Sequence, residues 1–287
     1  MNKETAMHSI IPLTSPAETK VVYSAANVGR MAQQDISNSL RRRDLWLGLA
    51  RRDIRDRFRR SVLGPIWLIL SNAVTIGAMA LVFGGLFHHP LERFLPYISV
   101  GIVTWTLIAN TLTEGCFAFI GAESYIKNIP APISIHVYRA VARNIIVWAY
   151  GMLIYLVVAA IFMVSPQPET LLVVPGFLVL VANISWMCMI MAVLAARFRD
   201  VQQIVASVLQ VVMVLTPIFW SPSDFPSRPV FIDINPFYHL IELIRAPLLG
   251  SAPAALSWVV SISLAIVGCA FSVMLFKIAY RRIPYWL

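Results

Sequence analysis

The chain has 287 residues, of which 59% are apolar and only 13% are charged, and its mean hydropathy is +0.74. Soluble proteins average about 45–50% apolar and about 25% charged residues, so this composition excludes a disordered chain, a disulfide-rich miniprotein and an ordinary soluble enzyme. The formal charge of +9 would suggest a nucleic-acid partner in a soluble protein, but in so apolar a chain we expect an integral membrane protein and no nucleic acid.

The first segment, residues 1–39, mixes Ser, Thr, Pro, Gln and Asn without a helical period. It holds no continuous apolar stretch of the signal-peptide type. The sequence therefore predicts a flexible cytosolic tail over this range.

Residues 40–62 predict an amphipathic helix at the cytosolic membrane interface. At 100° per residue, one face is apolar: Leu47, Ala50, Ile54 and Phe58. The opposite arc is basic: Arg51, Arg52, Arg55 and Arg59. The arginines can anchor the helix to anionic lipid headgroups. Alternatively, or in addition, Arg55, Arg59 and Arg60 bind phosphate groups of a lipid-linked substrate, because guanidinium pairs bidentately with phosphate.

Six apolar runs follow, each expected to cross a hydrocarbon core of about 30 Å at 1.5 Å per residue. They are Leu63–Phe87, Phe94–Ile120, Val141–Val164, Leu171–Ala195, Val201–Trp220 and Leu256–Phe276. Backbone groups in lipid must be hydrogen-bonded within the protein, so the runs are predicted to be helices. An alternative is that Val201–Trp220 is re-entrant, because Pro217 lies near its outer end. The fold class is thus an all-α membrane domain over residues 63–287.

The basic residues predict the orientation of these spans. Counted from Arg43 on, 15 Lys and Arg residues fall on the side of the N-terminus and 3 on the other side. By the positive-inside rule, both termini face the cytosol.

The cytosolic loop of residues 121–136 contains two prolines. The sequence predicts a short helix over about Ala122–Asn128 that ends before Pro130. Either this loop is a plain connector, or its helix protrudes and docks into a cytosolic partner.

The outer segment of residues 221–255 is rich in proline. Asn235-Pro236 is a good helix start, and the apolar stretch Phe237–Leu249 closes with Gly250. At about 13 residues it is too short to span, so we expect a re-entrant or interfacial helix. Glu242 and Arg245 are three residues apart and can pair on one face.

Several polar and aromatic residues lie within the spans. We expect Glu114 to pair with Arg139 or Arg143. Most Trp and Tyr residues fit an interfacial belt, but Trp105 and Tyr155 are also candidates to line a sliding path for sugar rings.

Catalytic signatures are missing from the sequence. There is no P-loop for ATP, no zinc-protease or nucleophile-elbow motif, and the three cysteines lie in apolar runs without metal-ligand spacing. We therefore expect neither a metal site nor enzymatic activity in this chain.

Four separated motifs resemble the ABC-2 type permeases that export polysaccharides, such as O-antigen, capsule and teichoic acid. They are RRDIRDRFRRSVLGPIW (Arg51–Trp67), AARFRDVQQIV (Ala195–Val205), TPIFW (Thr216–Trp220) and NPFYHLIELIRAPLLG (Asn235–Gly250). The motifs occur in the family's order. The resemblance extends from about Leu40 to Leu287, which is nearly the whole chain.

This resemblance implies a homodimer in a bacterial cytoplasmic membrane, with two separate subunits that bind ATP and Mg. The substrate would be a polyprenyl-diphosphate-linked glycan, moved outward. The family's coupling helix would match the 121–136 loop, with Glu123, Ser124, Tyr125 and Lys127. Its outer gate would match the 221–255 segment, with Pro236, Tyr238, Glu242 and Arg245.

Other functions stay open at this point. The chain could export another lipid or a small amphiphile. A membrane glycosyl- or acyltransferase is a further alternative, although such enzymes cluster acidic or His residues in a membrane-facing loop and the acidic residues here are scattered. The last alternative is a scaffold protein without catalytic or transport activity.

Overall fold

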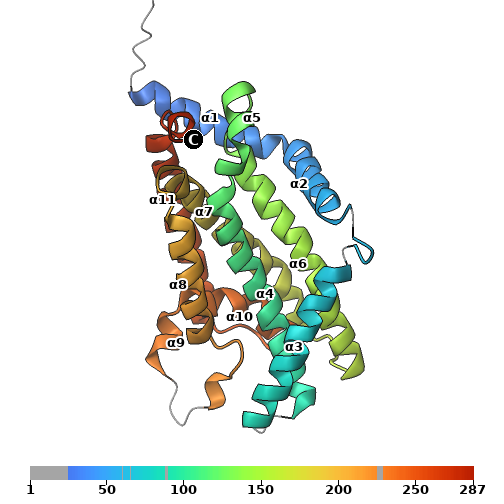
Figure 1. Cartoon of the computed structure of the whole chain (residues 1–287). Coiled ribbons are helices and arrows are strands. Elements are labelled where there is room, and N and C mark those ends of the chain that lie inside the picture. The colour runs from blue at the N-terminus through green and yellow to red at the C-terminus, as the bar shows by residue number, and fades with distance from the viewer. Residues whose placement is uncertain (1–24, 60, 65, 88–89, 225–228) are drawn as a thin grey trace, which may run out of the picture.

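The computed structural model describes residues 25–59, 61–64, 66–87, 90–224 and 229–287. These residues form twelve α-helices and three short 3-10 turns (Figure 1). The elements are α1 (Ala25–Arg41), α2 (Arg43–Phe58), α3 (Ile66–Phe87), α4 (Leu91–Phe117), η1 (Ile120–Ala122), α5 (Glu123–Asn128), α6 (Ile135–Ile161), η2 (Pro168–Leu172), α7 (Val173–Arg197), α8 (Val201–Leu215), η3 (Pro222–Asp224), α9 (Val230–Ile234), α10 (Pro236–Leu248), α11 (Ala255–Ala279) and α12 (Ile283–Trp286). The predicted all-α class is confirmed for this part of the chain.

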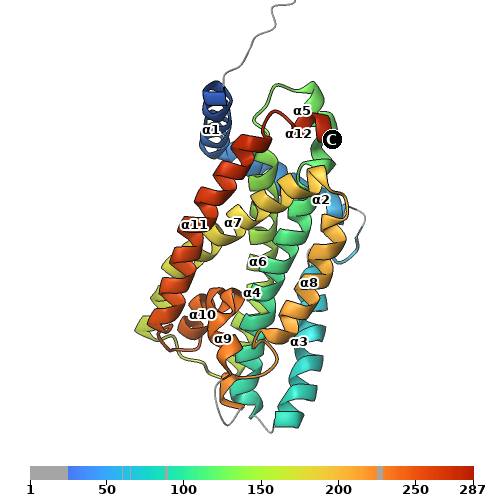
Figure 2. The same cartoon turned by 90° about the vertical axis from the view of Figure 1, so that its left-hand side faces the viewer.

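The long helices run side by side in one bundle, and the short ones gather at its two ends. Helices α1, α2, α5 and α12 lie at one end, which we call the arginine-rich end after the arginines of α2 (Figure 1). Helices α9 and α10 lie in the opposite half of the bundle (Figure 2). The last residue, Leu287, lies at the arginine-rich end with α1.

In the part of the chain that the structure describes, five helices are long and apolar enough to cross a membrane, namely α3, α4, α6, α7 and α11, so the chain is a multi-pass membrane protein. Helix α8 has only 15 residues, about 22 Å at 1.5 Å per residue. The helical part of the predicted run Val201–Trp220 is therefore shorter than expected, although α8 still leads from the arginine-rich end toward the half of the bundle that holds α9 and α10 (Figure 2). Pro217 ends the helix, because it holds Thr216 in an extended conformation (φ −89°, ψ 130°).

Helix α4 is the centre of the bundle and contacts α3, α6, α7, α8 and α10. In its most apolar stretch 72% of the residues are buried, against 11% in α3 and 22% in α11. Helices α3 and α11 therefore present apolar faces that are exposed in the single chain and fit an apolar surrounding such as lipid. Helix α11 packs closely on α7 because Gly268 has no side chain, and a Cβ there would lie 2.1 Å from the Trp186 ring.

The N-terminal segment differs from the sequence expectation. Residues 25–39 were predicted to lack helical period, but they belong to α1, which packs against α6 and α11. The packed face repeats at helical spacing with small and polar side chains, Ala32, Asp35 and Ser39, all at most 5% exposed. The sequence of α1 shows no apolar period because hydrogen bonds provide much of its contact with α6 and α11. Residues 1–24 lie outside the described part.

The predicted amphipathic helix forms as α2. Ala50 and Ile54 of its apolar face are buried where α2 packs on α6, and Leu47 and Phe58 are half-buried. A sharp turn follows at Gly64, whose φ of +55° suits glycine.

Candidate functional site

The basic face of α2 is exposed. Its arginines and Asp56 border a shallow groove of about 610 Å³. The groove residues are Gly48, Arg51, Arg52, Arg55, Asp56 and Arg59. Arg52 forms an exposed pair with Asp56 at 3.6 Å, whereas Arg55 and Arg59 form no ion pair with any described residue. Two of the three predicted phosphate-binding arginines are thus brought together and available; Arg60 lies outside the described residues.

On the opposite face of α2, Asp53 anchors an ionic network. Its carboxylate accepts hydrogen bonds from Arg139 and, at 2.8 Å, from Arg143. Arg143 also donates to Glu114 at 2.7 Å, and Asn144 donates to the same oxygen at 2.6 Å. The network joins α2, α6 and α4. Burial raises the pKa of Asp53, but the hydrogen bonds and charges of both arginines outweigh it and hold the pKa below its ordinary value.

The pairing of Glu114 with Arg143 confirms one of the two predicted partners. Sequence reasoning missed Asp53. The available signal was its position on the apolar face of α2, between Ala50 and Ile54. A carboxylate on a face that packs against another helix needs a cationic partner from that helix.

Helix α5 protrudes from the arginine-rich end (Figure 1). It has no buried residue, and Ile129 after it is extended before Pro130, which confirms the predicted short helix. The Nζ of Lys127 lies 2.7 Å from the Glu123 carboxylate, and the Tyr125 side chain is 54% exposed. The backbone carbonyl of Ser124 accepts a hydrogen bond from the side-chain amide of Asn128. All four predicted docking residues are therefore on one short exposed helix.

A polar cavity of about 160 Å³ lies between the turn η1, which leads into α5, and the ionic network. Its wall includes Gly121, His136, Arg139 and Arg143. The His136 ring lies 6.2 Å from the Tyr125 ring, centroid to centroid. The start of α6 therefore connects the protruding helix to the network.

Helix α1 is tied to the same region by Asp35. Its carboxylate accepts hydrogen bonds from the backbone N–H groups of Ile133 (2.7 Å) and Ser134 (2.9 Å) at the start of α6. It also accepts one from the Tyr280 hydroxyl (3.2 Å), just after α11. Burial and the Asp35 charge raise the pKa of Tyr280 to about 12. A carboxylate at a helix N-terminus is favoured by the helix dipole as well.

Helix α10 forms as the sequence predicts, within one residue at each end. The side chain of Asn235 accepts a bond from the Phe237 N–H at 2.9 Å and donates one to the Thr216 hydroxyl at 2.9 Å. Pro236 is the first helical residue, and Gly250 follows the helix with a φ of +82°. The cap therefore also fixes α10 to the end of α8.

The most buried charge in the described residues belongs to α10. Arg245 is 1% exposed and donates to Glu242 at 2.6 Å, which confirms the predicted pair. It also donates to the Pro217 carbonyl at 2.7 Å and lies 4.0 Å from the centre of the Tyr97 ring. Tyr238, the remaining candidate, is 7% exposed and packs edge-on against His239.

The two candidate channel aromatics are buried. Trp105 and Tyr155 are each 4% exposed. Trp105 packs edge-on against Phe237, with ring centres 5.7 Å apart, and the Tyr155 hydroxyl donates to the Leu248 carbonyl. Within the single chain neither ring faces an open path; both hold α10 in place. Their expected role as a sliding surface for sugar rings stays a prediction.

The predicted site residues thus form two groups, one at the arginine-rich end and one around α10. Among the described side chains, no three His, Cys, Asp or Glu residues gather as a metal site would require.

Comparison with known proteins supplies the family. Residues 44–249 match the family described as "ABC-2 type transporter". The chain is 22% identical over 207 residues to "O-antigen export system permease protein RfbA" of Myxococcus xanthus, which covers 71% of this chain and 80% of the relative. It is also 22% identical over 251 residues to a Klebsiella pneumoniae protein of the same name, covering 83% of this chain and 93% of the relative.

Proposed function

We propose, because this chain belongs to the ABC-2 type transporter family, that it is the permease of an ATP-driven exporter of a polyprenyl-diphosphate-linked polysaccharide. Membrane subunits of this family are non-catalytic, bind no cofactor themselves and pair with ATP-binding subunits. We infer an assembly of two copies of this chain with two ATP-binding subunits, in which ATP and Mg are bound.

The observation that carries the substrate class is the likeness to permeases of O-antigen export systems over most of the chain. The exposed Arg55 and Arg59 support it. Guanidinium groups without an internal partner are suited to a diphosphate, which they bind in a bidentate, charge-assisted manner. We assign the headgroup to this groove, with Arg60 as a third contact.

The orientation follows from the charge distribution. By the positive-inside rule, the 15 basic residues from Arg43 on that were assigned to the N-terminal side support a cytosolic position of the arginine-rich end. The common position of α1 and the C-terminus at this end (Figure 1) supports an even number of crossings. The membrane would be a bacterial cytoplasmic membrane, and α10 would lie in its outer half.

We assign coupling to α5 and gating to α10. The exposed side chains of α5, Glu123, Ser124, Tyr125 and Lys127, would contact an ATP-binding subunit. Movement of α5 would then reach α2 and α4 through Arg139 and Arg143. Helix α10, held by Arg245 and its partners, would close the outer side of the path.

The test is complementation of a strain that lacks this chain. We expect loss of surface polysaccharide and accumulation of the polyprenyl-linked glycan on the cytosolic side. The double variant Arg55→Glu/Arg59→Glu should insert normally but restore little export, whereas Arg30→Glu, on exposed α1, should restore it fully. Unchanged surface polysaccharide in the double variant would remove these arginines from the mechanism.

The alternative substrates give different results in the same strain. If the chain exports another lipid or a small amphiphile, the polyprenyl-linked glycan would not accumulate. If it is a transferase, the purified chain would act without an ATP-binding partner, whereas a permease should co-purify with one.

A further inference from the structure

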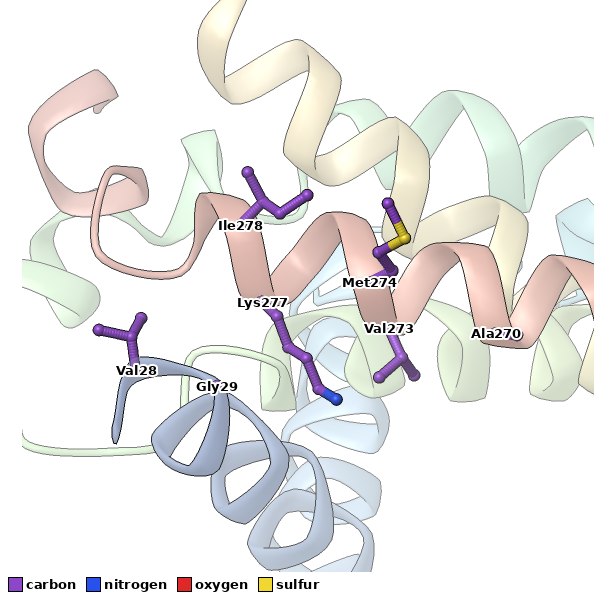
Figure 3. Close-up of a pocket in the computed structure, with 7 residues that line it drawn as sticks. All are labelled: Val28, Gly29, Ala270, Val273, Met274, Lys277 and Ile278. Carbon is purple, nitrogen blue, oxygen red and sulfur yellow. The ribbon is translucent and has the colours of Figure 1, made fainter. Parts of the chain in front are cut away.

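An apolar groove of about 500 Å³ lies between α1 and α11. The groove is lined by Val28 and Gly29 of α1 and by Val273, Met274, Lys277 and Ile278 of α11. Lys277 is the one charged residue among its lining residues, and its side chain extends from α11 toward α1 (Figure 3). Both helices lie outside residues 44–249, the part that the family matches.

The groove opens on a face of the apolar helix α11 that is exposed in the single chain. Met274 and Ile278 are 57% and 61% exposed, and so is much of the same face of α11. One wall is fixed, because the bonds to Asp35 hold α1 in place. The groove is therefore preformed, mostly apolar and open on the exposed side of a helix that is long and apolar enough to cross a membrane.

The position of Lys277 gives the groove a charge preference. It lies in the last turn of α11, at the end of the span, where side chains reach the headgroup level. It is half-buried and forms no hydrogen bond or ion pair with any residue that the structure describes. An ammonium group above an apolar groove, at this depth, is complementary to a lipid phosphate.

We propose that this groove is a binding site for one anionic phospholipid. An acyl chain lies between Val28 and Met274, and the headgroup phosphate contacts the Nζ of Lys277. The lipid fills the space between α1 and the bundle and so joins the N-terminal helix to α11.

Gly29 offers a direct way to close the groove. No atom lies within 4 Å of the place where a Cβ would stand, so a larger side chain fits there without a clash. Leu is also a better helix former than Gly. In Gly29→Leu, weaker lipid binding would therefore come from the filled groove and not from unfolding of α1.

Native mass spectrometry of the detergent-purified full chain, titrated with phosphatidylglycerol or phosphatidylcholine, tests the site. We expect phosphatidylglycerol to bind the wild type more tightly. Lys277→Gln should weaken phosphatidylglycerol binding about fivefold, the effect of about one basic residue at a membrane surface, and leave phosphatidylcholine binding unchanged. Gly29→Leu should weaken both. The control Arg199→Gln removes one exposed positive charge from the connection between α7 and α8 and should change neither.

Equal phosphatidylglycerol binding by the wild type, Lys277→Gln and Gly29→Leu would overturn the proposal. So would binding of only an adventitious lipid, equal for both headgroups. A variant that lacks residues 2–24 tests the other candidate occupant of the groove, which is the N-terminus of the chain itself. If lipid binds only after this deletion, the chain's own N-terminus fills the groove and the proposal is wrong.

Discussion

Arg245 of α10 and Tyr97 of α4 donate hydrogen bonds to the same acceptor, the carbonyl oxygen of Pro217 (2.7 and 3.1 Å). The guanidinium also stacks over the Tyr97 ring at 4.0 Å. Because Pro217 follows the end of α8, three elements meet at this one oxygen. The geometry makes Arg245 the residue that fixes α10 relative to α4 and α8.

Loss of this guanidinium should destabilise the fold strongly. In Arg245→Met the carboxylate of Glu242 is left without its cation in a largely buried place. Breaking a buried pair in this way costs about 3–5 kcal/mol, and we expect a clear drop in the thermal unfolding temperature of the detergent-solubilised protein.

The double variant Glu242→Leu/Arg245→Met is the control for that prediction. It removes both charges, so we expect it to regain much of the lost stability. If the single and double variants unfold at the same temperature, the ion pair is not what holds α10.

The Asp53 network predicts a defined pH dependence. The pKa of Asp53 is lowered in the folded chain, so its charge stabilises the fold at all pH values above the unfolded pKa, about 3.9. This contribution is lost as the pH falls through the folded pKa. Wild type should therefore exceed Asp53→Asn in thermal stability by a constant margin from pH 8 to 5, and the margin should shrink below about pH 4. A margin that grows on acidification would contradict the assignment.

Local signals predicted the structure well where one segment determines it. Asn235 and Gly250 mark the ends of α10, and Glu242 and Arg245 are neighbours on one helix turn. Pro217 carried the information that α8 ends early, but the apolar run continues past it and dominated the interpretation. The length of α8 could have been predicted from the proline alone.

Contacts between distant segments could not be read from the sequence. Asp53 and Arg139 are 86 residues apart, and neither has a sequence pattern that identifies the other. The burial of Trp105 and Tyr155 likewise depends on where α10 returns into the bundle. A period of apolar residues shows that a face is buried, but it does not show which element covers it.

Asp35 should keep the connection between α5 and α6 from opening locally. In Asp35→Ala the N–H groups of Ile133 and Ser134 lose their acceptor, at a cost of about 1–3 kcal/mol each. We expect faster amide hydrogen exchange at both residues and in α1. Tyr280→Phe removes only the hydrogen bond from the Tyr280 hydroxyl and keeps those from Ile133 and Ser134, so it should leave exchange at the start of α6 nearly unchanged. Equal acceleration in both variants would show that Tyr280, and not the helix start, carries the contact.

The exposed ring of Tyr125 should matter for partner binding and not for folding. Because Tyr125 is 54% exposed, Tyr125→Ala should change the free energy of unfolding by no more than about 0.5 kcal/mol. Co-purification of the ATP-binding subunit should fall. Met31→Ala, an exposed apolar side chain on α1 at the same end, is the matched control and should retain the subunit.

Docking of ATP-binding subunits and binding of a diphosphate headgroup both require that the arginine-rich end faces the cytosol. Single cysteines at Tyr125 on α5 and at Val230 on α9, which is 73% exposed, test this in intact cells with a membrane-impermeant thiol reagent, after replacement of the three native cysteines. We predict labelling at position 230 and none at position 125 until the cells are opened. Labelling at position 125 in intact cells, with position 230 protected, would contradict a cytosolic position of the arginine-rich end.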